Sequence, residues 1–369
     1  MKLRAAEVFR YELPLARPLH VRGAESVTAR SGWIVALHAD DTPGTKANGV
    51  VGFGEVAPLE FGAGAMARLE SELLDRVQQL DLSDVKGGMV GDGTACVAFG
   101  ISSALDNVRA QVSGVPLHRW YAAEASEVVH VNALIDLGTT DAAISSLLAT
   151  GYRCFKLKVG RGAVADEARE AKRIYLSLNG AALRLDANRA WTMAEACDFA
   201  DRISAIPIDY IEEPLEDADR LEELYYRTNW PIALDESLRE TPRDTDGYGR
   251  DNPLDLMRSD SSFLNAVVLK PSTLGDPGRT IALASAAGDV GIRSVVSSSL
   301  ESGIGLRALA ALAALPQCSS ESAGLSTHSL YRADTCRPSV RFGSTVDVDD
   351  LLRRRISLAD GLVSLRKFS

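Results

Sequence analysis

Short apolar runs separated by turns open the chain. Their lengths and spacing are typical of β-strands that follow one another in an antiparallel meander. The runs cover residues 6–13, 33–37 and 50–56, with a polar loop expected at residues 18–31. From about residue 65 to residue 121 the apolar positions instead recur every three or four residues, which predicts helices, one of them over residues 97–111. Strands followed by helices indicate an α+β unit.

A different pattern takes over after about residue 128. Short apolar strands are each followed by a helical run rich in Ala, Glu and Arg, with a repeat of roughly 22–33 residues, as expected of βα units. The strands are predicted at residues 129–135, 154–159, 183–188, 210–213, 232–236, 266–271 and 293–299, with a weak eighth at residues 324–328. Such a series predicts a β/α barrel. A doubly wound open sheet is the alternative, but no G-x-G-x-x-G follows the first strand.

Composition narrows the class of protein. The 369 residues, 46% of them hydrophobic and 24% charged, suit a globular chain with one large or two linked domains. A formal net charge of −10 has the wrong sign for nucleic-acid binding. No stretch approaches the roughly 18 apolar residues that a membrane span needs, and no apolar signal segment is present, so we expect a soluble, untargeted protein. The five cysteines are scattered without C-x-x-C spacing, which favours a reducing cytoplasm.

Charged side chains line the expected interior of the barrel. In the strand at residues 154–159, alternation turns the apolar residues toward the helices and places Lys156 and Lys158 inward. The next strand places Arg184, Asp186 and Asn188 inward in the same way. Because an unpaired buried charge costs several kcal/mol, these groups must neutralise one another or hold an ion. A purely structural network of salt bridges is the alternative.

Carboxylates recur at the carboxyl ends of the strands, where barrel active sites lie. Asp186, Glu212 and Asp235 come from three consecutive strands and form a set of oxygen ligands suited to Mg²⁺, with Mn²⁺ as a substitute. Lys158 and Lys270 flank the space above such a metal. This arrangement predicts an enolisation site, because a proton α to a carboxylate becomes acidic only when the enediolate is stabilised electrostatically.

Other polar residues near these groups are candidate substrate contacts: Lys156, Arg184, Asn188, Ser297 and Ser299. Lys158 must be a neutral amine to act as the base, so Lys156 is expected to depress its pKa or to contact the substrate. Arg184 is equally suited to an ion pair with a ligand, and Asn188 to a loop cap. The two serines point inward by alternation on the seventh strand.

Several motifs of the chain resemble the enolase superfamily, in its muconate-lactonizing-enzyme subgroup, and within it the o-succinylbenzoate synthases. In the first unit these motifs are residues 52–59 (GFGEVAPL) and 97–105 (VAFGISSAL). In the barrel they are residues 156–160 (KLKVG), 183–192 (LRLDANRAWT), 235–240 (DESLRE) and 297–306 (SSSLESGIGL). The resemblance spans nearly the whole chain.

This resemblance implies a modified TIM barrel, (β/α)₇β, at residues 126–334. It also implies an α+β capping domain at residues 1–125, completed by a C-terminal tail at about residues 335–369 that packs back on it. The implied ligands of Mg²⁺ are Asp186, Glu212 and Asp235, with Lys158 as the acid and base and Lys270 as a cation that stabilises the enediolate. Ser297 and Ser299 are implied to bind carboxylate oxygens of the substrate.

The reaction implied by the resemblance is dehydration of 2-succinyl-6-hydroxy-2,4-cyclohexadiene-1-carboxylate to 2-succinylbenzoate, a step of menaquinone or phylloquinone synthesis. The partner is therefore a small-molecule carboxylate. Residues 324–328 depart from the family, because they lack the acidic residues of the synthases and the acidic pair of dipeptide epimerases. A polar segment at residues 240–262 is expected to be a surface insertion.

Three alternative functions are compatible with the same residues. An N-acylamino-acid racemase or dipeptide epimerase would use Lys158 and Lys270 as two bases on opposite faces of the substrate. A Schiff-base aldolase would use one of these lysines as a nucleophile. A non-catalytic barrel would use the interior charges for structure alone.

Overall fold

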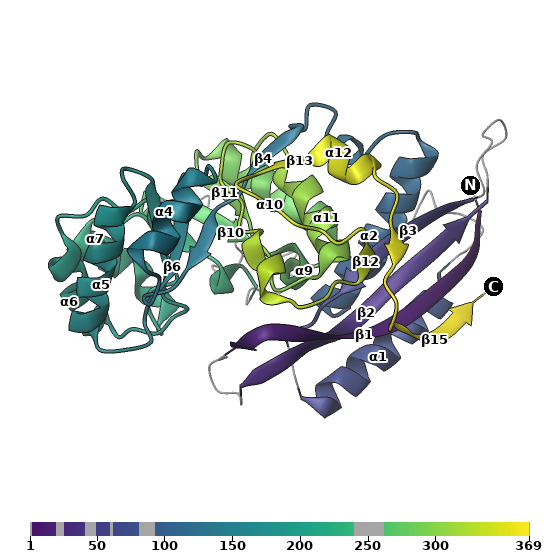
Figure 1. Ribbon diagram of the computed structural model, residues 1–369, viewed down its shortest axis with the longest axis horizontal. Coiled ribbons are helices and arrows are strands. Elements are labelled where there is room, and N and C mark those ends of the chain that lie inside the picture. The colour runs from purple at the N-terminus through teal and green to yellow at the C-terminus, as the bar shows by residue number, and fades with distance from the viewer. Residues whose placement is uncertain are drawn as a thin grey trace.

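The computed structural model describes residues 2–19, 26–40, 49–59, 62–80, 93–239 and 262–368. These residues form two units that lie side by side, an antiparallel sheet with its helices and a parallel barrel surrounded by helices (Figure 1). The predicted segment at residues 240–262 lies outside the described residues except for its last position. No helix among the described residues has the length and apolar character needed to cross a membrane.

Four antiparallel strands build the sheet of the first unit, in the order β15-β1-β2-β3. They are β1 (Leu3–Leu19), β2 (Val27–Ala39), β3 (Val50–Val56) and β15 (Val363–Phe368). The three strands predicted near the N-terminus are confirmed. The loop expected at residues 18–31 is wrong at residues 18–19 and 27–31, which are strand, and its residues 20–25 lie outside the described residues. Leu19 of β1 pairs with Val27 of β2 beyond an irregularity that follows Pro14, so strand pairing extends into the range expected to be a loop.

Two long helices cover one face of this sheet. They are α1 (Ala63–Gln78) and α2 (Ala95–Val112), and the short α3 (Leu117–Tyr121) follows. The predicted apolar stripe of α1 is its buried face, formed by Leu69, Leu73 and Val77. α2 approaches β3 closely because Gly54 has no side chain: a Cβ atom there would lie 1.9 Å from the carbonyl oxygen of Gly100.

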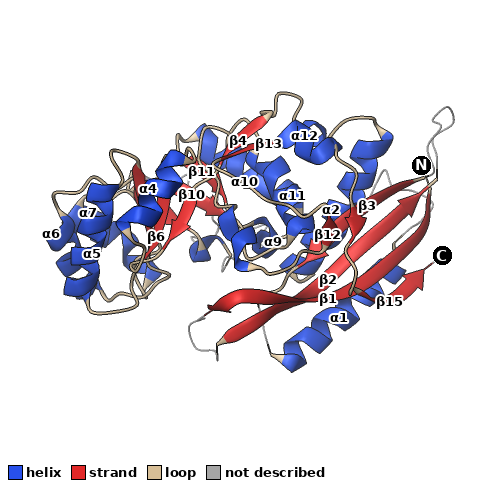
Figure 2. Ribbon diagram, viewed as in Figure 1, coloured by secondary structure: helices blue, strands red, loops and turns tan. Residues whose placement is uncertain are grey.

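Seven parallel strands in sequence order form the wall of the barrel. They are β5 (Ala133–Ile135), β6 (Cys154–Lys158), β7 (Ala182–Asp186), β8 (Tyr210–Glu212), β9 (Ile232–Leu234), β10 (Leu264–Leu269) and β11 (Arg293–Val296). Helices lie outside them (Figure 2). Those helices are α4 (Asp141–Ala149), α5 (Val164–Ser177), α6 (Met193–Ile203), α7 (Leu221–Thr228), α9 (Pro271–Leu274), α10 (Pro277–Asp289) and α11 (Gly303–Ala313).

The eighth position of the barrel differs from its predicted form. Two isolated parallel bridges, Ser297 with Gly324 and Val131 with Ala323, connect the two edges of the sheet. The strand expected at residues 324–328 is wrong, because the chain turns at once into the 3₁₀ helix η3 (Ser326–Leu330). The barrel prediction holds, and its last strand is reduced to a pair of bridges.

The end of the chain runs from the barrel back to the first unit. The strand predicted at residues 129–135 is two strands, and the first of them, β4 (Val128–His130), pairs with β13 (Thr345–Asp347). Beyond α12 (Val348–Arg353), the last strand β15 pairs with β1. In the same tail, β12 (Cys336–Arg337) and β14 (Ser357–Leu358) pair with each other in a short antiparallel ladder.

Candidate active site

Six ionisable side chains meet at the carboxyl ends of strands β6 to β10. The lysines are Lys156, Lys158 and Lys270, and the carboxylates are Asp186, Glu212 and Asp235. Strand pairing brings several of them to the same height along the barrel axis, because Lys158 lies opposite Asp186 and Asp186 lies opposite Glu212 in the parallel ladder. The three carboxylates are buried, with at most 1% of each exposed. We call these six residues the charged group.

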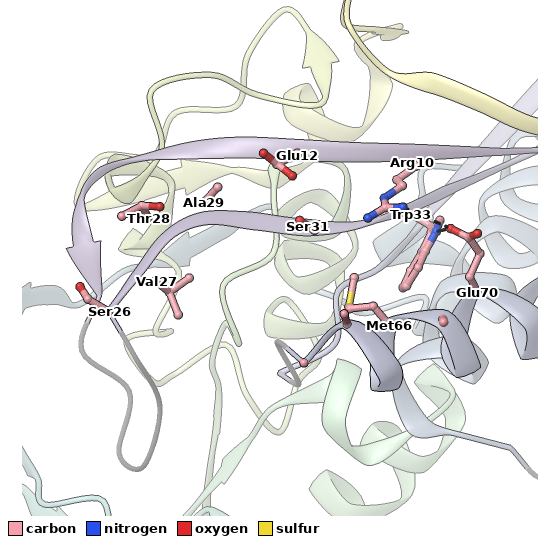
Figure 3. Close-up of a pocket in the computed structure, with 13 residues that line it drawn as sticks. Arg10, Glu12, Ser26, Val27, Thr28, Ala29, Ser31, Trp33, Met66 and Glu70 are labelled. Carbon is pink, nitrogen blue, oxygen red and sulfur yellow. Dashed lines mark hydrogen bonds and ion pairs between the residues drawn. The ribbon is translucent and has the colours of Figure 1, made fainter.

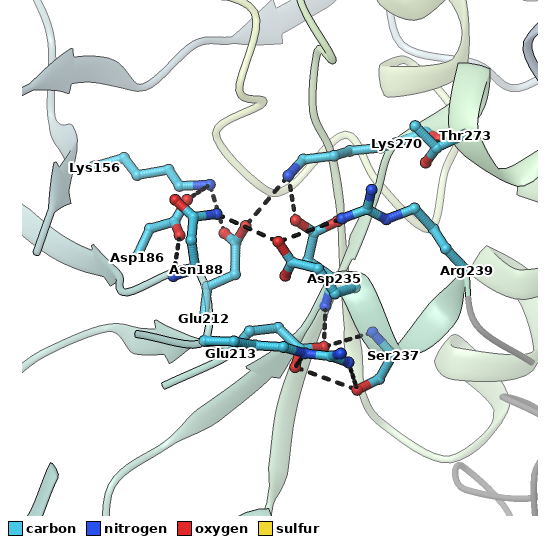
Figure 4. A network of polar contacts seen from close by, with 12 residues as sticks. Lys156, Asp186, Asn188, Glu212, Glu213, Asp235, Ser237, Arg239, Lys270 and Thr273 are labelled. Atoms are coloured by element: carbon cyan, nitrogen blue, oxygen red, sulfur yellow. Dashed lines mark hydrogen bonds and ion pairs between the residues drawn. The ribbon is translucent and has the colours of Figure 1, made fainter. Parts of the chain in front are cut away.

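Each lysine of the charged group contacts at least one carboxylate of a neighbouring strand, as Figure 4 shows for Lys156 and Lys270. Lys156 Nζ lies 2.8 Å from Asp186 Oδ2 and 2.5 Å from Glu212 Oε2. Lys158 Nζ lies 2.5 Å from Asp186 Oδ2. Lys270 donates to Asp235, and its Nζ lies 3.6 Å from Glu212 Oε1. Ammonium groups therefore separate the carboxylates from one another.

The three lysines have different electrostatic surroundings. Burial, reinforced by the ammonium groups of Lys156 and Lys270, lowers the pKa of Lys158 despite the nearby Asp186. For Lys156 and Lys270, burial alone would also lower the pKa, but the carboxylates around each of them outweigh it and raise the pKa. Lys158 is thus the lysine of the three that most readily becomes a neutral amine.

Asn188 lies where the sequence predicts, beside the charged group. Its Oδ1 accepts a hydrogen bond from Lys158 Nζ at 2.7 Å, and its Nδ2 donates to Glu236 Oε1 at 3.4 Å. Glu236 in turn lies 3.3 Å from Arg239, whose guanidinium is 3.7 Å from Asp235. Strand alternation does not mark this Glu–Arg pair as functional, and its proximity to Asp235 in the sequence is the signal that points to it.

The carboxylates of the charged group fit a hard divalent cation. Glu212 Oε1 and Asp235 Oδ1 are buried and accept no hydrogen bond from any described residue. Burial and the neighbouring Asp186 raise the pKa of Glu212 to about 7, so the negative charge of Glu212 is incompletely compensated where it lies. Among the described residues no three side chains form a ready-made set of metal ligands, since the ammonium groups lie between the carboxylates. An all-oxygen donor set of this kind suits Mg²⁺ or Mn²⁺.

The two candidate serines lie just beyond β11. The amide of Ser297 donates to the carbonyl of Leu269, the residue before Lys270, at 2.8 Å. Ser299 is buried, its amide donates to Glu301, and its hydroxyl has no hydrogen-bond partner in the part of the chain that the structure describes. The segment after β11 therefore lies next to the strand end that carries Lys270.

Arg184 does not join the charged group, which corrects its expected role as a substrate contact. Its guanidinium donates to Asp209 and Glu321, each at 2.7 Å, and lies 4.8 Å from the ring centroid of Tyr210. Alternation along the strand predicts that Arg184 faces the interior, and it does. Its side chain lies closer than Asp186 to the amino ends of the strands, where Asp209 and Glu321 bind it.

The first unit contains a separate cavity of about 770 Å³ between β1, β2 and the start of α1 (Figure 3). Arg10, Trp33 and Glu70 line it, and the Trp33 indole donates to Glu70 at 2.9 Å. None of its lining residues belongs to the charged group. The candidate site is therefore identified by its chemistry and not by the size of a cavity.

Two family models match the chain. Residues 139–350 match the family model "Enolase C-terminal domain-like", and residues 3–108 match "MenC, N-terminal domain". The o-succinylbenzoate synthase of Vibrio cholerae serotype O1 (strain M66-2) is 30% identical over 356 residues, which cover 91% of this chain and 93% of the relative. The o-succinylbenzoate synthase of Pectobacterium atrosepticum is 30% identical over 316 residues, covering 84% and 86%.

Solved structures show the same fold at lower sequence identity. Muconate lactonizing enzyme from Pseudomonas fluorescens, complexed with muconolactone, superposes with a TM-score of 0.77 at 22% identity, over 93% of this chain and 92% of that one. The N-succinyl Arg/Lys racemase from Bacillus cereus has a TM-score of 0.77 at 18% identity, over 100% and 99%. These matches concern the arrangement of the two units.

Proposed function

The chain belongs to the enolase superfamily, and on that basis we propose that it is an o-succinylbenzoate synthase of the bacterial cytoplasm. Its reaction would be the Mg²⁺-dependent syn dehydration of 2-succinyl-6-hydroxy-2,4-cyclohexadiene-1-carboxylate to 2-succinylbenzoate in quinone biosynthesis. The observation that carries the proposal is the charged group, which combines a lysine of lowered pKa with a lysine held as a cation by Asp235 and Glu212. Synthases that align along 91% of the chain support the substrate.

Asp186, Glu212 and Asp235 would hold the metal. When bound, Mg²⁺ would act as a Lewis acid on the carboxylate of the substrate and make its α-proton more acidic. The lysines that separate these carboxylates would then turn from them toward the substrate. Lys156, which contacts two of the three carboxylates, is placed to keep Lys158 neutral or to contact the substrate.

Lys158 would act first as base and then as acid. As a neutral amine it takes the α-proton, and the electron pair of the C–H bond forms the enediolate. The ammonium of Lys270 stabilises the added negative charge. When the electron pair returns, the C–O bond to the hydroxyl group breaks, and the Lys158 ammonium gives its proton to the leaving oxygen. The products are the aromatic ring and one water molecule.

Two smaller roles complete the proposal. Asn188 accepts a hydrogen bond from Lys158 and orients its amino group. Ser297 and Ser299 would bind carboxylate oxygens of the substrate, and the unpartnered hydroxyl of Ser299 supports this assignment. A buried hydroxyl without a partner is unfavourable, so a substrate oxygen would satisfy it.

The proposal is tested with the purified protein, Mg²⁺ and the cyclohexadiene substrate, following aromatisation by ultraviolet absorbance. We expect turnover that stops on addition of EDTA and returns with excess Mg²⁺. The Lys158→Ala variant, folded by circular dichroism, should show no turnover. Absence of turnover by the parent protein would exclude the synthase while leaving the superfamily membership unaffected.

Racemisation or epimerisation of an N-acylated amino acid or dipeptide is the second candidate. It is favoured because two lysines of the charged group, Lys158 and Lys270, extend from opposite strands of the barrel. Such a reaction needs Lys270 as a base, whereas Asp235 and Glu212 raise its pKa and favour the cation. Incubation of each enantiomer in deuterium oxide separates the reactions. Exchange of the α-proton of both enantiomers would establish the racemase.

A further inference from the structure

Glu213 follows Glu212 directly but turns away from the charged group (Figure 4). It is fully buried, and both of its carboxylate oxygens already accept hydrogen bonds from protein donors. We propose that Glu213 is a positioning residue that fixes the Asp235 carboxylate and the neighbouring strand ends in the geometry required to hold a divalent cation. This inference rests on the proposed function only for the identity of the cation site.

The side chain of Glu213 is bound to the segment that follows β9. Its Oε1 accepts from the amide of Asp235 at 3.0 Å and from the amide of Ser237 at 2.8 Å. Its Oε2 accepts from the hydroxyl of Ser237 at 3.2 Å. The backbone of a proposed metal ligand is therefore held by a buried carboxylate, with no flexible or solvent-exposed group between them.

The same residue also contacts the segment after β7 and strand β9 itself. Its Oε2 forms an ion pair with Nε of Arg189 at 3.0 Å, and its carbonyl accepts from the amide of Arg189 at 2.7 Å. Its own amide donates to the carbonyl of Ala233 in β9 at 3.1 Å. Since Arg189 lies three residues beyond Asp186, Glu213 links the segments that carry all three carboxylates of the charged group.

The backbone of Glu213 adopts a conformation that such a residue rarely takes. Its φ angle is +39°, in the left-handed region that favours glycine. A glutamate persists in that region when the surrounding contacts outweigh the strain. The four donors to its carboxylate are those contacts.

Residues that orient metal ligands affect metal affinity without touching the metal. Loss of such a partner typically weakens binding by 10- to 100-fold. In Glu213→Gln one oxygen becomes an NH₂ group, which cannot accept from the donors that face it. The Asp235 backbone would then lose a fixed partner, and the carboxylate would no longer be held toward the site.

The test measures Mn²⁺ binding by titration calorimetry in the absence of substrate, so it does not depend on turnover. We expect Glu213→Gln to bind Mn²⁺ at least tenfold more weakly than the parent protein. The matched control is Glu167→Gln, because Glu167 is equally buried and accepts from the amides of Gly160, Arg161 and Gly162 in a segment without a proposed ligand. That variant should bind Mn²⁺ within twofold of the parent.

A second variant keeps the inference testable if Glu213→Gln does not fold. Ser237→Ala removes one donor to the carboxylate and leaves Glu213 in place, and it should weaken Mn²⁺ binding about threefold. The inference is overturned if the folded Glu213→Gln variant binds as tightly as the parent, if both glutamine variants weaken binding equally, or if the parent binds no Mn²⁺. Tight Mn²⁺ binding without turnover of the cyclohexadiene would instead overturn the proposed function alone.

Discussion

Lys158 and Lys270 carry the same group in different surroundings, and the proposed roles follow from that difference. We expect Lys158→Arg to lower kcat about a thousandfold, on the order of 4 kcal/mol, since a guanidinium keeps the charge but is no base near neutral pH. Lys270→Arg should lower kcat less, because its role requires only positive charge. Initial rates at saturating substrate concentration measure kcat for the two variants and the parent. Activity of Lys158→Arg within tenfold of the parent would contradict the assignment.

The three carboxylates of the charged group are predicted to act together. Asp186→Ala, Glu212→Ala and Asp235→Ala should each abolish turnover and weaken Mg²⁺ binding by at least tenfold, because each removes an oxygen ligand. Calorimetry with Mg²⁺ measures the affinity, and circular dichroism establishes that each variant is folded. Any variant that binds Mg²⁺ as tightly as the parent would show that its residue is not a ligand.

At the scale of single residues, the period of two along a strand carries most of the predictive information. It brings Lys158, Asp186 and Glu212 to one level because neighbouring parallel strands are in register there. The alternation predicts correctly which face of the sheet Arg184 occupies. It does not predict the height of this side chain along the barrel, which depends on the acids that surround it. Glu213 could not be placed in this way, because its left-handed backbone breaks the alternation.

Among the elements, α11 depends on a side chain from the other unit. Glu55 of β3 is fully buried and accepts from the amides of Ser302 and Gly305 at the first turn of α11. It also accepts from the hydroxyl of Tyr11 at 2.6 Å. A carboxylate at the beginning of a helix satisfies free amides and interacts favourably with the helix dipole. This contact fastens the first unit to the barrel beside the segment that carries Ser299.

We expect Glu55→Gln to lower the free energy of unfolding by about 2 kcal/mol, because one buried amide loses its acceptor. Urea titration followed by circular dichroism measures the change. Glu223→Gln is the control, since Glu223 is partly exposed on α7 and its ion pairs there should contribute little. Equal stability of the two variants would exclude a special role for the Glu55 contact.

His118 makes the packing of α3 sensitive to pH. It is fully buried, neither ring nitrogen has a hydrogen bond, and Asp349 of α12 is 3.9 Å away. Burial, reinforced by Arg119, lowers the pKa of His118 below its usual value of 6.5. The unfolded chain therefore binds a proton at a higher pH than the folded protein, so stability falls as the pH drops from about 6.5 toward the folded pKa.

The corresponding measurement is the urea midpoint between pH 7 and pH 5 for the parent and for His118→Leu. The parent should lose more stability over this interval than the variant, because the variant lacks the proton uptake of this side chain. His130→Gln, at an exposed position, should keep the slope of the parent. A slope unchanged in His118→Leu would contradict the prediction.

The sequence predicts elements best where a regular period continues. The barrel strands lie where expected to within a few residues, because each combines an apolar run with a following helix. The far end of the ribbon of β1 and β2 was predicted as a loop because of its polar residues. The eighth strand was predicted to be longer than it is. Its two bridges depend on the sheet edges that β5 and β11 leave open, and no local sequence pattern indicates those edges.

For the whole molecule, the two ends of the chain meet in one sheet. β15 covers the edge of β1 that β2 leaves open, with Ala6 opposite Phe368 and Arg10 opposite Val363. Leu365 and Phe368 pack against the core of the first unit. The last strand therefore supplies hydrogen bonds and apolar contact to a unit that is otherwise built from the first part of the sequence.

Deletion of residues 363–369 is predicted to loosen the first unit while sparing the metal site. β1 would become an open edge with unpaired amides and carbonyls, and such edges favour association between molecules. We expect the thermal unfolding midpoint to fall by several degrees and light scattering to show self-association. Mn²⁺ affinity should stay within threefold of the parent, because every residue of the charged group lies between positions 156 and 270. Leu365→Ala should reproduce part of the fall in the unfolding midpoint, and Ser364→Ala, at an exposed position, should leave the midpoint unchanged. An unchanged midpoint in the deletion variant would show that β15 contributes nothing to the stability of the fold.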